Sequence, residues 1–464
     1  MNPRDDIIAA IVTPIGEGGI SVVRVCGRGA VEFASQRFRG KSSLTLAASH
    51  TAHFGLFTDR NGDIIDEVVS TVFRAPHSYT AEDTVEFSCH GGMYISRRIL
   101  GTLVESGARP AEPGEFTRRA FLNGRMDLSQ AEAVADLISS RSERSHRVSV
   151  AQLRGKLSGK IAELREKLLN LCSLLELELD FSEEGIELTD KSNINSSLTS
   201  VIRDIAGLID SYNQGRLYRE GVRVALIGRP NVGKSSILNS LLSDDRAIVT
   251  DVPGTTRDTI QESLTIDGLL FSVIDTAGLR KSEDKVELEG MLRTKREADH
   301  ADIVAFISEP DDELIQEDLQ SLISLRNGAS SQRACIVVVN KIDLKPDWRV
   351  TTSNGEGDFP TVYTSAKTGL GFERLKSCIL ELSCQGNGSS TDSSPMITNE
   401  RHAQSLTKAR ECLLRAQEDS VEGKSNEFIA INLRLAMENL GEVVGVVTTD
   451  EVLDNIFARF CIGK

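Results

Sequence analysis

Gly228-Arg229-Pro230-Asn231-Val232-Gly233-Lys234-Ser235 is the stretch that decides the fold of this chain. It matches the pattern GxxxxGK[ST], follows the β-branched run Val222–Ile227 and precedes residues with helical spacing. Glycines in such a loop let backbone N–H groups gather around phosphate oxygens, and the N-terminus of the next helix adds partial positive charge. We therefore predict a phosphate-binding loop (P-loop), in which Lys234 contacts the β- and γ-phosphates and Ser235 binds Mg²⁺. The predicted nucleotide-binding residues here are Asn231, Val232, Gly233, Lys234, Ser235 and Ser236.

The residues around this loop alternate short β-branched runs with helical stretches. This alternation is typical of a parallel sheet covered by helices. The predicted strands are Val222–Ile227, Leu270–Ile274, Ile303–Ile307, Cys335–Val339 and Thr361–Tyr363. A Gly- and Ser-rich linker follows. We therefore predict a P-loop GTPase domain with a mostly parallel sheet over residues 221–387.

Two motifs further along the chain predict which base is bound. Asn340-Lys341-Ile342-Asp343 follows a predicted strand and matches NKxD. The Asp343 carboxylate can accept hydrogen bonds from N1–H and the exocyclic amine of guanine, a pair of donors that adenine lacks. Asn340 can brace the loop, and the Lys341 stem can lie along the base. Ser365-Ala366-Lys367 fits a companion loop that touches guanine O6 through its backbone. The predicted nucleotide is GTP.

Two other segments fit contacts to the γ-phosphate and to magnesium. Asp275-Thr276-Ala277-Gly278 ends a predicted strand, so Asp275 would hold Mg²⁺ through water and the Gly278 N–H would sense the γ-phosphate. In Thr255-Thr256-Arg257-Asp258, Thr256 would complete the Mg²⁺ shell, although a polar surface loop is the alternative. Leu279 stands where Ras-like GTPases place the glutamine that orients water. Another residue must therefore orient the water, or hydrolysis is slow.

The 464-residue chain is too long to fold around a single hydrophobic core. Three residue patterns can be told apart along the chain, which predicts three domains. Residues 1–122 read as mixed β/α, with a hairpin whose arms are His53–Phe57 and Ile64–Phe73. Residues 123–220 and 388–464 have the three- and four-residue spacing of amphipathic helices. Because these helices flank residues 221–387, we predict one discontinuous helical domain with the GTPase domain inserted.

Composition excludes several classes of protein. The sequence has no run of eighteen apolar residues, no secretory signal layout and no CxxC pair among its eight cysteines. We therefore expect no membrane association, no zinc site or disulfide framework, and a cytoplasmic location. The formal net charge of −15 argues against nucleic-acid binding by bulk attraction. An RNA partner would need a local basic patch or a helper protein, and candidates for such a patch are Arg97, Arg98, Arg118 and Arg119.

The chain resembles, over its whole length, the family of the tRNA-modifying GTPase MnmE (TrmE). The stretches that carry the resemblance are Pro113-Gly114-Glu115-Phe116-Thr117, Arg119-Ala120-Phe121-Leu122-Asn123, Asp127-Leu128-Ser129-Gln130-Ala131-Glu132-Ala133, DTAGLR followed by Val286-Glu287, and Phe460-Cys461-Ile462-Gly463-Lys464. The resemblance implies a homodimer that works with an FAD-dependent MnmG-type partner, as a heterotetramer, on certain tRNAs. The FAD belongs to the partner. The product carries a carboxymethylaminomethyl or aminomethyl group at C5 of the wobble uridine.

The resemblance also implies cofactors and site residues. Residues 1–122 would dimerise and bind a tetrahydrofolate (the 5-formyl or 5,10-methylene form) that donates the carbon. The implied folate-binding residues are Arg24, Glu86, Arg125 and Lys464; ordinary surface ion pairs are the alternative. Arg125 stands where the family commonly shows lysine, and Ala81 replaces a glycine. Cys461 is either a nucleophile toward uridine C6 or a residue with a positioning role.

In the GTPase domain the resemblance implies a potassium ion and a catalytic carboxylate. K⁺ would be held by Asn231, Thr250, Val252 and Thr255, at the place that an arginine finger fills elsewhere. Glu287 would orient the attacking water, although a solvated helix charge is the alternative reading. Two other functions remain open: a ribosome-assembly-type regulatory GTPase that does not modify RNA, and a dimerising scaffold whose GTPase domain merely signals.

Overall fold

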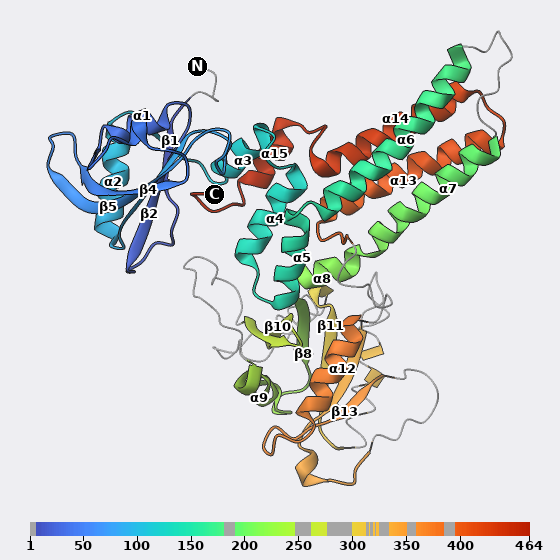
Figure 1. Ribbon diagram of the computed structural model, residues 1–464. Coiled ribbons are helices and arrows are strands. Elements are labelled where there is room, and N and C mark those ends of the chain that lie inside the picture. The colour runs from blue at the N-terminus through green and yellow to red at the C-terminus, as the bar shows by residue number, and fades with distance from the viewer. Residues whose placement is uncertain are drawn as a thin grey trace, which may run out of the picture. The chain divides into compact units, whose positions relative to one another are not determined.

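The computed structural model describes residues 6–180, 191–245, 261–275, 299–311, 315, 319–320, 322–323, 334–349, 359–384 and 395–464 (Figure 1). The chain divides into two compact units, each made of segments that are far apart in the sequence. Unit 1 consists of Met1–Ala135, Gln152–Ile186 and Asn426–Lys464, and unit 2 consists of Asp136–Ala151 and Glu187–Ser425. The domain boundaries given above from the sequence, at residues 122, 220 and 387, stay predictions.

Unit 1 contains a seven-stranded sheet in the order β3-β4-β5-β6-β2-β1-β7. Its strands are β1 (Ile8–Ile11), β2 (Ile20–Cys26), β3 (Phe38–Gly40), β4 (Thr51–Thr58), β5 (Ile64–Phe73), β6 (Thr84–His90) and β7 (Arg109–Pro110). All described neighbours are antiparallel except β1 and β7. The predicted hairpin is confirmed, because β4 and β5 pair along their length.

One face of this sheet is covered by α1 (Ala30–Ser35) and α2 (Met93–Glu105). Val23, Val25, Val85 and Phe87 point into the core under these helices. Because side chains alternate along a strand, Arg24 and Glu86 lie on the opposite face, and the register of β2 and β6 places them side by side. This pairing brings two predicted folate residues together.

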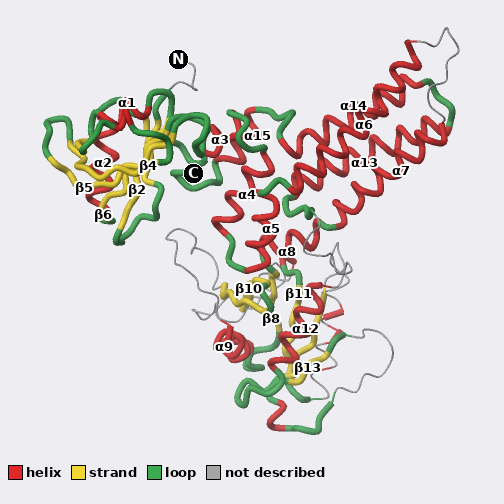
Figure 2. The backbone as a smooth tube through the Cα atoms, in the orientation of Figure 1, coloured by secondary structure: helices red, strands yellow, loops and turns green. Residues whose placement is uncertain are grey.

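Besides α1 and α2, the described helices that lie wholly or mostly in unit 1 are α3 (Glu115–Leu122), α4 (Leu128–Ser139), α6 (Lys156–Asp180), α14 (Asn426–Val444) and α15 (Asp450–Phe457). Elements α6 and α14 are long helices packed side by side (Figure 2). The three- and four-residue spacing predicted for residues 123–220 is seen in α6, where the buried apolar residues are Leu157, Ile161, Leu164, Leu168 and Leu171. A second core joins α3 and α4 to α15, with Ala120, Leu128 and Phe457 buried. Residues from both ends of the sequence therefore form this unit.

Unit 2 contains a six-stranded sheet in the order β13-β12-β11-β8-β10-β9. Its strands are β8 (Val222–Ile227), β9 (Gln261–Ile266), β10 (Leu269–Asp275), β11 (Ile303–Ser308), β12 (Ala334–Val339) and β13 (Thr361–Tyr363). The five predicted strands are confirmed and pair in parallel. Sequence reasoning missed β9, an antiparallel edge strand joined to β10 by a turn at Asp267 and Gly268, both with positive φ.

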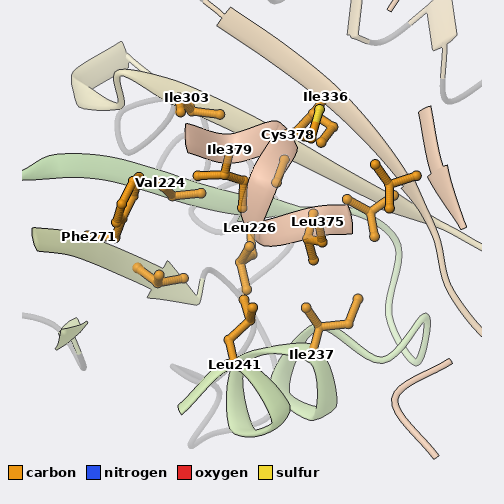
Figure 3. Close-up of a cluster of buried hydrophobic side chains, with 14 of the residues drawn as sticks. Val224, Leu226, Ile237, Leu241, Phe271, Ile303, Ile336, Leu375, Cys378 and Ile379 are labelled. Carbon is orange, nitrogen blue, oxygen red and sulfur yellow. The ribbon is translucent and has the colours of Figure 1, made fainter. Parts of the chain in front are cut away.

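The core of unit 2 positions the nucleotide motifs (Figure 3). Val224 and Leu226 of β8 pack against α9 (Lys234–Asp245) and α12 (Phe372–Cys384), whereas Ala225 and Ile227 lie in a second core on the other face. Other helices among the described residues are α5 (Glu143–Leu153), α7 (Lys191–Asp210), α8 (Tyr212–Glu220) and α13 (Glu400–Val421), with α7 packed on α13. Short 3₁₀ turns cover Leu44–Leu46 and Ile342–Leu344. In the described part of the chain no helix has both the length and the apolar character needed to cross a bilayer.

Candidate functional sites

The predicted P-loop connects the end of β8 to the start of α9. The Lys234 Nζ donates hydrogen bonds to the carbonyls of Gly228 and Arg229, each at 2.7 Å, and the lysine is only 5% exposed. Gly233 has a φ of 95°, and a Cβ there would lie 2.3 Å from the Asn340 amide nitrogen. Only glycine fits at this position. Local geometry therefore places the lysine ammonium group inside the loop.

One buried amide links the P-loop to both base-recognition loops. Asn340, which follows β12, is 2% exposed. Its Nδ2 donates to the Val232 carbonyl at 2.9 Å, and its Oδ1 accepts from the Ala366 backbone N–H at 3.1 Å. Replacing this side chain would leave the buried Val232 carbonyl and the partly buried Ala366 N–H without this partner. Asn340 thus lies where the predicted brace should be.

Asp343 and Lys341 occupy the other positions of the NKxD segment. Asp343 accepts a hydrogen bond of 2.6 Å from the Ser365 hydroxyl, and Ser365 is fully buried. This contact orients the carboxylate that we predict to bind guanine. Lys341 has a φ of 60°, and its Nζ donates to the Asn231 carbonyl at 2.8 Å and pairs with Glu309. The Lys341 stem therefore spans from the base loop to the P-loop. Lys367 is exposed.

Several predicted nucleotide-site residues lie outside the described residues. They are Thr250, Val252, Thr255, Thr256, Thr276, Ala277, Gly278 and Glu287. Asp275 is the last residue of β10, next to β8 in the sheet. Ser235 and Ser236 lie in the first turn of α9 and are exposed, and Asn231 is exposed with a φ of 66°. The Mg²⁺ and K⁺ sites and the role of Glu287 therefore stay predictions.

In unit 1, the four residues predicted to bind folate converge. Arg24 extends from β2 and contacts Oε1 of Glu86 on β6 through both Nε and a terminal nitrogen, each at 2.8 Å. Its other terminal nitrogen donates to the Gly463 carbonyl at 3.4 Å. Arg125 follows α3, and Lys464 ends the chain. The structure thus brings together positions separated by more than four hundred residues.

Tyr79 lies at the centre of this cluster, and sequence reasoning did not assign it to the site. Its ring centroid is 5.5 Å from the Arg24 Cζ, 5.1 Å from the Arg125 Cζ and 5.8 Å from the Lys464 Nζ. The Arg24 guanidinium is also 5.2 Å from the Phe116 ring, so it contacts two aromatic rings. In the sequence, Tyr79 is recognisable only as an aromatic residue two positions before Ala81. That position does not reveal which residues surround the ring in the folded chain.

The electrostatics of this cluster favour an anion. Burial, together with the nearby charge of Arg24, lowers the pKa of the Lys464 ammonium, and Glu86 only partly opposes this effect. Neither Arg125 nor Lys464 has a carboxylate partner in the described part of the chain. A ligand carboxylate would offset the repulsion that Lys464 experiences from Arg24. The residues present therefore fit a ligand with an acidic tail.

The C-terminal tail packs back onto the N-terminal segment. The Phe116 N–H donates to the Lys464 carbonyl at 3.2 Å. Gly463 has a φ of 96°, and a Cβ there would lie 2.8 Å from the Ile11 carbonyl, so the tail needs glycine. These contacts fix Lys464 at the site. The Cys461 side chain is exposed, and its chemical role stays a prediction.

A charged network anchors the loop that carries Tyr79. Arg119 of α3 is 6% exposed and pairs with Glu82 at 3.2 Å, Glu115 at 3.1 Å and Asp6 at 2.5 Å. The proposal of Arg119 as an RNA contact was therefore wrong, because burial and ion pairing occupy the side chain. Ala81 has a φ of 62°, a left-handed conformation that a glycine would adopt at lower cost.

Comparisons with known proteins identify the family of this chain. Residues 7–125 match the model of the GTP-binding protein TrmE N-terminus, and residues 128–461 match the model of the MnmE helical domain. The tRNA modification GTPase MnmE of Chlorobium luteolum is 43% identical, covering 98% of this chain and 97% of its own. That of Salinibacter ruber is 42% identical, covering 99% of this chain and all of its own. The chain therefore belongs to the tRNA modification GTPase MnmE family.

Proposed function

We propose that this chain is a K⁺-stimulated GTPase that modifies C5 of the wobble uridine of certain tRNAs together with an FAD-dependent MnmG-type partner. The observation that carries this proposal is the convergence of Arg24, Glu86, Arg125 and Lys464 in the chain that also holds an assembled P-loop. A purely regulatory GTPase has no use for this N-terminal cation cluster. The family relationship supports the same assignment.

The chain's own residues have distinct tasks in the nucleotide site. Lys234 binds phosphate oxygens, and Asp343, oriented by Ser365, accepts from the guanine N–H groups. Ser235 and Thr256 would hold Mg²⁺, and Asn231, Thr250, Val252 and Thr255 would hold K⁺. When bound, these ions would supply positive charge for phosphoryl transfer. Glu287 orients the attacking water. Hydrolysis drives pairing of two GTPase domains in a homodimer and so a rearrangement of the protein.

In the N-terminal site the chain binds and orients a tetrahydrofolate in its 5-formyl or 5,10-methylene form. When bound, this cofactor supplies the one-carbon unit. Arg125 and Lys464 contact its acidic tail, and Glu86, held by Arg24, accepts from N–H groups of the pterin. This division of roles follows from which charges already have a partner in the chain.

A reconstituted reaction tests the proposal. Unmodified tRNA is incubated with the purified chain, an MnmG-type partner, GTP, FAD, a nitrogen donor (glycine or ammonium) and 5,10-methylenetetrahydrofolate, in K⁺ or Na⁺ buffer, and its nucleosides are analysed by mass spectrometry. We expect the modified wobble uridine only when both proteins, the folate and K⁺ are present. GTP turnover with unmodified tRNA in the complete mixture would contradict the proposal and favour the regulatory GTPase.

A further inference from the structure

The Tyr79 ring lies close to three cations that differ in their bonding. Arg24 is already paired with Glu86 and the Gly463 carbonyl. Arg125 and Lys464 lie 5.1 Å and 5.8 Å from the ring centroid, and within the described residues they have no carboxylate partner. The ring is therefore the contact that these two cations share.

Lys464 is partly buried beside Arg24, and both burial and this like charge disfavour its ammonium form, whereas Arg125 is exposed. An aromatic face offsets part of that cost, because its negative quadrupole attracts a cation within about 6 Å of the centroid. A flexible lysine gains most from such a contact, since its side chain otherwise samples many rotamers. The ring thus fixes where the two unpaired charges stand.

Tyr79 itself is held from several sides. Its hydroxyl is 2.9 Å from the Thr117 Oγ1, and Thr117 is fully buried on α3. The next residue, Thr80, contacts the Cys26 Sγ at 2.9 Å, and its carbonyl accepts from the Asn123 amide at 2.8 Å. These bonds leave the ring little freedom to turn, so the chain itself sets its orientation.

We infer that Tyr79 is a positioning residue of the proposed folate site, whose ring holds Arg125 and Lys464 in place for the carboxylates of the ligand. This inference rests on the proposed function, because the ligand is the tetrahydrofolate. It assigns Tyr79 no contact with the reacting carbon. Its role is to keep two unpaired cations close together before the ligand arrives.

The experiment replaces Tyr79 in the full-length chain and measures binding of 5-formyltetrahydrofolate by calorimetry. Three side chains are compared: Tyr79→Leu, Tyr79→Phe, and pentafluorophenylalanine incorporated at position 79. The last keeps the ring's shape but reverses its quadrupole. We expect Tyr79→Phe to bind within about twofold of the wild type, and the fluorinated ring and Tyr79→Leu to weaken binding about tenfold, the factor expected for a partly desolvated cation–π contact.

Controls separate this inference from the proposed function. Tyr94→Leu changes an exposed tyrosine on α2 and should bind the folate like the wild type. If the wild type does not bind the folate at all, the proposed function fails. If the wild type binds and the fluorinated ring binds equally well, the positioning role is overturned while the proposed function stands. Equal losses for Tyr79→Phe and the fluorinated ring would also overturn it, since the hydroxyl would then be the cause. These two variants decide the matter even if Tyr79→Leu does not fold.

Discussion

The nucleotide site takes its described residues from short contiguous motifs, whereas the N-terminal site joins residues as distant as Arg24 and Gly463, which are 439 positions apart. In the first site, each motif is fixed by its own strand and turn, and Asn340 connects them. In the second, the position of every cation depends on the sheet, on α3 and on the C-terminal tail at once. A local motif is therefore tolerant of changes elsewhere, and the N-terminal cluster is not.

The largest effect is expected from a substitution that should disable the nucleotide site and leave the N-terminal site unchanged. Lys234→Ala removes the buried ammonium group from the P-loop, and we expect the rate of GTP hydrolysis to fall by about 10²–10³. Folate binding, measured on the same sample, should match the wild type. Loss of both GTP hydrolysis and folate binding would mean that the two sites are not independent, which would contradict this comparison of the two regions.

Arg24→Leu should damage the N-terminal site alone. It leaves the Glu86 carboxylate without its two-nitrogen contact, and we expect folate affinity to fall by about 100-fold, a loss of about 3 kcal/mol. Arg24→Lys keeps the charge but not the forked geometry and should give an intermediate loss. Calorimetry checks both variants, and full affinity in Arg24→Leu would remove this residue from the site.

The network under the Tyr79 loop predicts a stability effect that depends on pH. Arg119→Met leaves carboxylates of Asp6, Glu82 and Glu115 without a buried partner, and we expect the free energy of unfolding at pH 7 to fall by about 3 kcal/mol. Urea denaturation of the full chain, followed by a probe in unit 1, measures this. A loss below about 1 kcal/mol would show that the network is not a major contributor.

The direction of the pH effect follows from two carboxylates of this network. Burial opposes ionisation of Asp6 and Glu115, but hydrogen bonds from Arg109, and at Asp6 also from Arg119, outweigh it, so both pKa values lie below their ordinary 3.8 and 4.5. Their stabilisation is therefore present above about pH 4.5 and is lost as the pH falls through the lowered values. The wild type should lose stability over this acidic range more steeply than Arg119→Met. An equal slope in the two proteins would contradict the assignment.

The smallest expected effect lies in unit 2. Arg144 of α5 contacts Asp267 in the β9–β10 turn at 2.7 Å, but the aspartate side chain is 66% exposed. Arg144→Met should therefore lower the free energy of unfolding by less than about 1 kcal/mol. The matched control is Arg147→Met on the same helix, which removes a pair with the exposed Glu143. A loss above about 2 kcal/mol for Arg144→Met would show that this turn is anchored more firmly than its exposure suggests.

Sequence reasoning succeeded where a feature is local and failed where it depends on tertiary contacts. The β-branched runs and the P-loop are contiguous, so five strands of unit 2 were predicted. The edge strand β9 was missed because its residues Gln261–Ile266 mix polar and apolar side chains. Arg119 was misread because burial is invisible in a sequence, and Tyr79 was overlooked because no motif identifies the neighbours of a ring.

The most direct test of the account is a nucleoside analysis of tRNA from cells that lack this protein. The gene is restored as the wild type, as Lys234→Ala or as Arg24→Leu, with equal protein levels verified by immunoblotting. We predict that the C5-modified wobble uridines disappear in the deletion, return with the wild type and return with neither variant, because both sites are needed. Modified uridines that persist in the deletion would contradict the account, and full rescue by either variant would show that the corresponding site is not required.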